Sequence, residues 1–149
     1  KEVNHIFHHC SPTTQIILLG HGSDKGLYYR EDSRIEGFDN VIVGHPHRHW
    51  LLNGHNIGGI FCNSDLFAKA EGLHGLYTGM IISELSEAEQ YGIHTTEAEL
   101  SCENVKFVTR LRQLLNEGYL LHEIPDRMLA LDDTQSELTK FNYGNFFYL

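Results

Sequence analysis

A histidine and a cysteine each follow a short apolar run in this chain of 149 residues. His21 comes soon after the run at residues 15–19, and Cys62 comes directly after the run at residues 57–61. An imidazole can take the proton of a thiol or pair with the thiolate, and the thiolate is the form that attacks a carbonyl carbon. His21 and Cys62 together therefore indicate a nucleophilic thiol site.

The two apolar runs have the length and aliphatic composition of strands that are covered on both faces of a sheet. If they are neighbours in a parallel sheet, both side chains project from its carboxyl edge, where open α/β sheets bind ligands. Gly20 and Gly22 flank His21 and leave the backbone open to a substrate. The backbone amide of Gly22 is a candidate oxyanion donor.

The rest of the chain alternates between strand and helix patterns. This alternation favours an α/β fold with a mainly parallel sheet, in a single domain spanning residues 1–149. Residues 20–23 are expected to form a turn, and Ser64 or Asp65 is the expected cap of the helix that follows Cys62. Further strands are expected at residues 26–30 and 40–43, as a hairpin, and at residues 76–83. Helices are expected at residues 47–52, 64–73, 84–89, 96–118 and 125–131.

The composition excludes several classes of partner. Twenty acidic residues against eleven Lys and Arg give a formal charge of −9, which is the wrong sign for binding nucleic acid. No apolar run approaches the ~20 residues that are needed to cross a bilayer. The three cysteines cannot all pair within one chain, so we expect a reducing, cytoplasmic location.

A family resemblance arises from the Gly-His-Gly turn after the first strand, the hairpin that begins at residues 26–28, and the apolar strand that ends at Cys62. These features resemble the core of the caspase-like cysteine peptidases, the group that includes caspases, legumain, gingipains and the bacterial CHAT peptidases. The resemblance spans residues 15–84. It implies a three-layer α/β sandwich that hydrolyses a peptide or protein substrate without a cofactor. It also implies that His21 is the general acid and base, Cys62 the nucleophile, and the Gly22 amide an oxyanion donor.

The resemblance also suggests residues that bind substrate. That family builds its first specificity pocket near the end of the third strand, where Ser83 and Glu84 lie in this sequence. A carboxylate there would favour Lys or Arg in the substrate. The alternative is that Glu84 is a solvated carboxylate at the start of a helix. Asp24 is a candidate for orienting His21 or contacting the substrate.

The leading fourteen residues are polar and rich in histidine, whereas the resembled fold has a strand before residue 15. We therefore expect the chain to begin after that strand. The aromatic tail at residues 141–149 is expected to pack on the body of the protein or on a partner, including a second copy in a homo-oligomer. A catalytically inactive domain of the same fold, which binds a partner through the same cleft or through the tail, is the alternative to a peptidase.

Two metal-binding interpretations also remain. Residues 18–23 resemble the strand-to-turn motif of the small tetrapyrrole chelatases, in which the histidine binds the incoming metal and a second histidine, here His74 or His94, would be required. Separately, His45, His47 and His49 are weak candidates for binding Zn, Ni or Cu ions. His5, His8, His9 and His55 could join them. The alternative is a polar surface segment that binds no metal.

Overall fold

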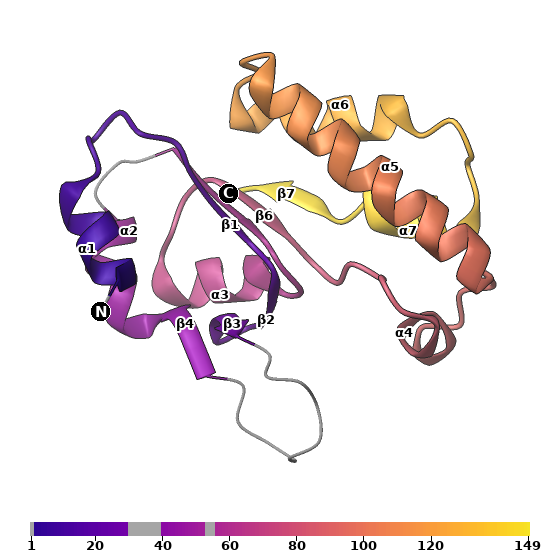
Figure 1. Ribbon diagram of the computed structural model, residues 1–149, viewed down its shortest axis with the longest axis horizontal. Coiled ribbons are helices and arrows are strands. Elements are labelled where there is room, and N and C mark those ends of the chain that lie inside the picture. The colour runs from indigo at the N-terminus through magenta and orange to yellow at the C-terminus, as the bar shows by residue number, and fades with distance from the viewer. Residues whose placement is uncertain (1, 30–39, 53–55) are drawn as a thin grey trace. The chain divides into compact units, whose positions relative to one another are not determined.

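The computed structural model describes residues 2–29, 40–52 and 56–149. The chain forms two compact units, Lys1–Gly79 with Phe147–Leu149, and Met80–Phe146 (Figure 1). The expectation that both belong to a single domain stays a prediction. In the described part of the chain, no helix combines the length and apolar character needed to span a membrane.

The first unit is α/β with a mixed, mostly parallel sheet, as the sequence predicts (Figure 1). Strand β5 lies between β1 and β6 and is parallel to both. Gly75 and Leu149 exchange two backbone hydrogen bonds of 2.8 and 3.0 Å, the pattern of an antiparallel pair. The elements are α1 (Glu2–His9), β1 (Ile16–Leu19), β2 (His21–Ser23), β3 (Gly26–Tyr29), β4 (Asn40–Gly44), the 3₁₀ helix η1 (His45–His47), α2 (Arg48–Leu51), β5 (Ile57–Ile60), α3 (Ser64–Glu71), β6 (Leu76–Thr78) and β7 (Phe146–Tyr148).

The core of this unit explains why β5 lies at the centre of the sheet. All four residues of β5 are buried, which fits a strand covered on both faces. Helix α3 contacts β5 and β6 and also the hairpin β2–β3. The buried cluster consists of Phe7, Leu18, Val43, Leu51, Ile57, Phe61, Phe67, Ala68, Leu73 and Tyr77.

The second unit is mainly helical. Its longest helix begins where the sequence predicts, because Thr96 Oγ1 accepts a hydrogen bond of 3.2 Å from the backbone N–H of Glu99. Five side chains of that helix, at spacings of three or four, are buried. The elements are α4 (Leu85–Gln90), α5 (Glu97–Asn116), η2 (Leu121–Glu123), α6 (Ile124–Leu131) and α7 (Glu137–Tyr143).

The third core strand is shorter than predicted. Strand β6 ends at Thr78, and residues 80–82 are not part of a strand. The backbone of Ile82 bonds instead to the Asn142 side chain, whose Oδ1 accepts from Ile82 N at 2.8 Å and whose Nδ2 donates to Ile82 O at 2.9 Å. The apolar run therefore reflects burial of Ile82 against helices and not strand pairing.

Two further expectations need correction. His21–Ser23 is strand β2, which pairs with β3 in an antiparallel hairpin, and not a turn. The cap position of α3 is Asn63, and not Ser64 or Asp65; Asn63 has a left-handed backbone with φ 60°. Asparagine tolerates this conformation better than most residues, which allows the chain to turn sharply after β5.

The aromatic tail packs on the body of the protein. It forms the end of α7 and strand β7, and Tyr143 and Phe146 are buried in the second unit against Phe107. Phe147 and Tyr148 remain exposed. A contact between copies of the chain through this tail stays a prediction.

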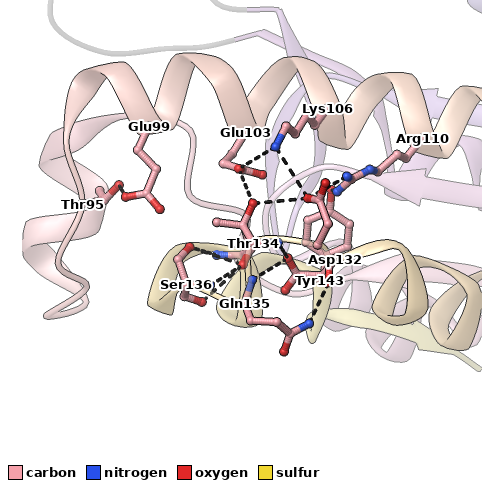
Figure 2. Close-up of polar contacts among 12 residues, drawn as sticks. Thr95, Glu99, Glu103, Lys106, Arg110, Asp132, Thr134, Gln135, Ser136 and Tyr143 are labelled. Carbon is pink, nitrogen blue, oxygen red and sulfur yellow. Dashed lines mark hydrogen bonds and ion pairs between the residues drawn. The ribbon is translucent and has the colours of Figure 1, made fainter.

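A polar cluster ties α5 to the loop between α6 and α7. Thr134 Oγ1 donates to Oε1 of the buried Glu103 at 2.7 Å, and Lys106 Nζ lies 3.3 Å from the same oxygen. Figure 2 shows Glu103, Lys106 and Arg110 directed from α5 toward Thr134 and Tyr143. The hydrogen bond to Glu103 raises the pKa of Lys106. We interpret this cluster as a structural link, because the Thr134 hydroxyl and the 2.9 Å ion pair between Arg110 and Asp133 join the two segments.

We predict that Asn142→Ala lowers the free energy of unfolding of the second unit by about 3 kcal/mol, because a buried N–H and a buried C=O of Ile82 both lose their partner. Urea unfolding followed by far-UV circular dichroism measures this loss. Asn145→Ala is the matched control; it removes one hydrogen bond, from Asn145 Nδ2 to Phe141 O, and should cost about 1 kcal/mol. Equal losses in the two variants would contradict the role given to Asn142.

Candidate functional site

The register of β1 and β5 determines where the candidate histidine and cysteine lie. The strands are parallel, with Leu19 opposite Ile60, and Gly20 N donates to Ile60 O at 3.4 Å. His21 and Cys62 each lie two residues beyond this last pair. The backbones that carry the two side chains therefore leave the sheet at the same carboxyl edge, as the sequence predicts.

Cys62 occupies a tight turn between β5 and α3. The turn is fixed on one side by Asn63 N, which donates to Gly79 O at 3.1 Å, and closed by Ser64 N, which donates to Phe61 O at 3.1 Å. Cys62 is partly buried and lies two positions before Ser64, the first helical residue of α3. The amino end of a helix favours a negative charge, so this position favours the thiolate form of a cysteine.

Two buried hydroxyl groups hold the turn against β6. Ser64 Oγ donates to Gly59 O and accepts from Thr78 N at 2.8 Å, while Thr78 Oγ1 donates to Phe61 O at 2.9 Å. Both side chains are fully buried. This role of Ser64 and Thr78 is not predicted by the sequence. The sequence feature that could have indicated this role is the polar pair Asn63 and Ser64, which follows shortly after a buried strand. The same pair is also typical of a helix cap.

His21 lies on β2, where it is exposed and opposite Tyr28 of β3. The hairpin beside it is held by a hydrogen bond between the Ser23 and Tyr28 hydroxyl groups, and Lys25 N donates to Ser23 Oγ at 3.0 Å. An exposed ring on a braced hairpin is accessible to a substrate. Cys62 and His21 thus come from separate, well-supported elements of one unit.

Gly22 lies close to Phe61, the residue before Cys62. A methyl group at this position would lie 2.2 Å from Cδ2 of Phe61 and 2.6 Å from the Gly26 carbonyl oxygen. The residue before Cys62 thus packs directly against the residue after His21. Packing therefore requires glycine at position 22. The sequence alone does not reveal this reason for the glycine.

The predicted substrate-binding residues lie in different parts of the chain. Asp24 is in the β2–β3 turn, exposed, with its carboxylate 3.4 Å from Lys25 Nζ. Ser83 and Glu84 belong to the second unit and lie at the start of α4, because β6 ends five residues before Ser83. The roles of Asp24, Ser83 and Glu84 in substrate binding stay predictions.

Ser83 and Glu84 line a cavity of about 270 Å³ within the second unit. Ser83 is held in place, because its N–H donates to Glu87 Oε2 at 2.8 Å and its carbonyl accepts from Asn104 Nδ2 at 3.0 Å. The remaining lining residues are Leu85, Glu97, Leu100, Ser101 and Asn104. Two carboxylates in this lining favour positively charged groups over negatively charged ones.

The histidines that were considered for metal binding make other contacts. His45 Nδ1 lies 2.7 Å from Glu71 Oε2, His47 Nδ1 accepts from Gly44 N at 3.0 Å, and the His49 ring lies 4.7 Å from the Trp50 ring. Within residues 2–29, 40–52 and 56–149, no three His, Cys, Asp or Glu side chains are grouped to hold a metal ion. His55 lies outside the described residues. The structure therefore offers no support for a metal site at these histidines.

The chelatase interpretation also lacks support in the described part of the chain, because no group of metal ligands includes His21 or His74 there. His94 lies in the second unit, where its Nδ1 is 3.0 Å from Glu137 Oε2. Hydrogen bonds from His94 lower the pKa of Glu137. His94 thus has a structural partner in Glu137.

Searches for similar proteins find no matching family model, no matching curated protein and no matching solved structure. The function must therefore be inferred from the β1–β5 edge itself. At that edge the chemistry-bearing residues of the first unit are an exposed imidazole and a partly buried thiol beside a helix amino end.

Proposed function

We propose that the chain is a cysteine peptidase of the caspase-like type, with Cys62 as nucleophile and His21 as general acid and base. The parallel register of β1 and β5 carries this proposal, because it brings the residues that follow the two strands to one edge. The packing of Gly22 against Phe61 supports it, since these residues adjoin His21 and Cys62. The proposed fold is a three-layer sandwich around the mostly parallel sheet.

In the proposed reaction, the proton of the Cys62 thiol passes to His21 and the thiolate attacks the carbonyl carbon of the scissile peptide bond. The backbone amides of Gly22 and Cys62 hold the resulting oxyanion. The carbon–nitrogen bond then breaks, and His21 gives its proton to the leaving amine. Water, deprotonated by His21, hydrolyses the thioester and releases the second product and the thiol.

The local structure supports a reactive thiol at Cys62 more than at the other two cysteines. Cys62 lies at the amino end of α3, whereas Cys102 is exposed within the long helix α5 and Cys10 follows the carboxyl end of α1. A helix amino end stabilises a thiolate, and neither Cys10 nor Cys102 lies at one.

Alkylation tests this proposal without knowledge of the substrate. At pH 6.5 an ordinary thiol is only about 1% thiolate, so we expect iodoacetamide to label Cys62 at least roughly 10-fold faster than Cys10 or Cys102. Peptide mass spectrometry after timed quenching measures the three rates in one sample. His21→Ala should slow labelling of Cys62 alone, and His74→Ala, an exposed histidine of the same unit, should not.

The comparison with Cys102 makes the test decisive. Cys102 is exposed and Cys62 is only partly so, and access alone therefore favours Cys102. Faster labelling of Cys102, or a Cys62 rate that does not respond to His21→Ala, would contradict the proposed dyad.

A further inference from the structure

Six of the eleven histidines lie on three elements of the first unit, α1, η1 and α2. Figure 1 shows α1 beside α2. The two are joined through rings: Phe7 of α1 lies 6.0 Å from the His47 ring, and His8 lies 5.6 Å from the Trp50 ring. We name the contact of α1 with η1 and α2 the histidine clasp; its histidines are His5, His8, His9, His45, His47 and His49.

His47 is the central residue of the clasp. Its Nδ1 accepts the backbone N–H of Gly44 at 3.0 Å, so this nitrogen must carry a lone pair and no proton. Gly44 is buried at the end of β4, so its N–H depends on a partner within the protein. Phe7, whose ring contacts the His47 ring from α1, is buried in the core of the unit. The observed arrangement therefore requires His47 to be neutral.

The charged groups around His47 make its protonation more costly. Helix α1 presents Glu2 and the three histidines, and η1 with α2 presents His45, Arg48 and His49. Strand β4 carries no ionisable side chain. From α3, Glu71 already bonds to His45 and to Arg48. Protonation of the clasp would add up to six positive charges beside Arg48, against the two carboxylates Glu2 and Glu71.

We propose that the histidine clasp is a pH-sensitive latch, which holds α1 on η1 and α2 when His47 is neutral and releases α1 when His47 takes up a proton. Protonated His47 cannot accept from Gly44, so the ring must turn away and the contact with Phe7 is lost. This device explains six of the histidines that the proposed peptidase site does not use.

Two effects oppose release, and both are weak in this setting. A protonated imidazole gains some attraction from the edge or face of an aromatic ring, and the protonated His8 and His9 would favour the carboxyl end of α1. His8 and His9 are exposed, where solvent screens these gains. The unpaired N–H of the buried Gly44 is not screened in this way.

The pH at which the latch opens follows from the environment of His47. Burial, the largest of several effects that do not all act in the same direction, lowers the pKa of His47 below its ordinary value of 6.5. A histidine whose pKa is lower in the folded state stabilises that state above its unfolded pKa, and this contribution is lost as the pH falls. Opening is therefore expected below pH 6.5.

Trp50 is the single tryptophan of the chain and lies inside the clasp, so its fluorescence reports the latch directly. We expect its emission to shift reversibly to longer wavelength between pH 8 and pH 5, with a midpoint below 6.5. Far-UV circular dichroism should change little over the same range. Amide hydrogen exchange of residues 2–9, corrected for the intrinsic effect of pH, should become at least about 10-fold faster.

Two variants separate His47 from the other histidines. His47→Asn keeps an oxygen that can accept from Gly44 N–H and cannot take up a proton, so the transition should disappear or move by more than one pH unit. His74→Asn replaces an exposed histidine outside the clasp and should leave the midpoint unchanged. If His47→Asn does not fold at pH 8, the hydrogen exchange of residues 2–9 in the unmodified chain decides the question.

Three results would overturn the proposal: Trp50 emission that stays constant down to pH 5, a Trp50 shift that coincides with loss of the far-UV signal of the whole chain, or an unaltered midpoint in His47→Asn. Constant exchange of residues 2–9 between pH 8 and pH 5 would overturn it as well. None of these measurements depends on peptidase activity.

Discussion

Cys62→Ala and His21→Ala are each expected to reduce peptide hydrolysis by about 10³-fold or more, because one removes the nucleophile and the other the group that moves its proton. The measurement uses fluorescein-labelled casein together with fluorogenic peptides that place Lys, Arg or Asp before the scissile bond. The double variant should be no slower than either single variant, since the two residues act as one unit.

Matched controls separate catalysis from folding. Cys102→Ala removes an exposed thiol and His74→Ala an exposed imidazole, and both should retain full activity. The far-UV spectra of all variants should agree. If the unmodified chain hydrolyses these substrates no faster than Cys62→Ala does, the peptidase proposal fails, and a catalytically silent binding domain becomes the better interpretation.

Gly22→Ala is expected to lower the free energy of unfolding of the first unit by about 3 kcal/mol, because its methyl group would overlap the Phe61 ring and the Gly26 carbonyl oxygen. Urea unfolding followed through Trp50 measures the loss. Gly72→Ala is the control in the same unit. Its φ of +69° disfavours alanine, but its nearest neighbour lies 3.8 Å away, so only about 1 kcal/mol is expected.

A double-mutant cycle identifies the contact. In a Phe61→Leu background the ring is gone, and the cost of Gly22→Ala should fall by roughly 1 kcal/mol. An undiminished cost would show that Phe61 is not the residue that requires glycine at position 22. A loss no larger than that of Gly72→Ala would contradict the close approach itself.

The sequence predicts those parts of the fold that depend on local patterns. Strands β1 and β5 are short apolar runs, and α5 has buried residues at helical spacing between a Thr cap and a glycine, so their types and approximate bounds are confirmed. The antiparallel pairing of β3 with β4 and the mostly parallel sheet are confirmed as well.

The remaining features depend on contacts between distant residues. The apolar run at residues 80–82 looks like a strand, but Asn142, 60 positions later, bonds to the Ile82 backbone. Gly22 looks like an open position for a substrate, but the Phe61 ring lies against it. Ser64 and Thr78 look like ordinary polar residues until β5 and β6 bring them together. No periodicity within one segment could reveal these pairs.

In the candidate site, too, some features follow from local sequence patterns and others depend on contacts between distant residues. The positions of His21 and Cys62 after two strands can be read from the sequence, and the β1–β5 register is the arrangement that this reading requires. The placement of Ser83 and Glu84 in the second unit could not be read in this way, because it depends on where β6 ends.

The pH dependence of Cys62 alkylation and its response to His21→Ala test the central claim most directly, since a thiolate paired with a protonated histidine reacts well below the pKa of an ordinary thiol. Between pH 8.5 and 6.5, we predict that the labelling rate of Cys62 falls by less than about threefold, and that His21→Ala restores a fall approaching tenfold per pH unit. A Cys62 rate that already falls in this way in the unmodified chain, with His21→Ala making no difference, would contradict the dyad.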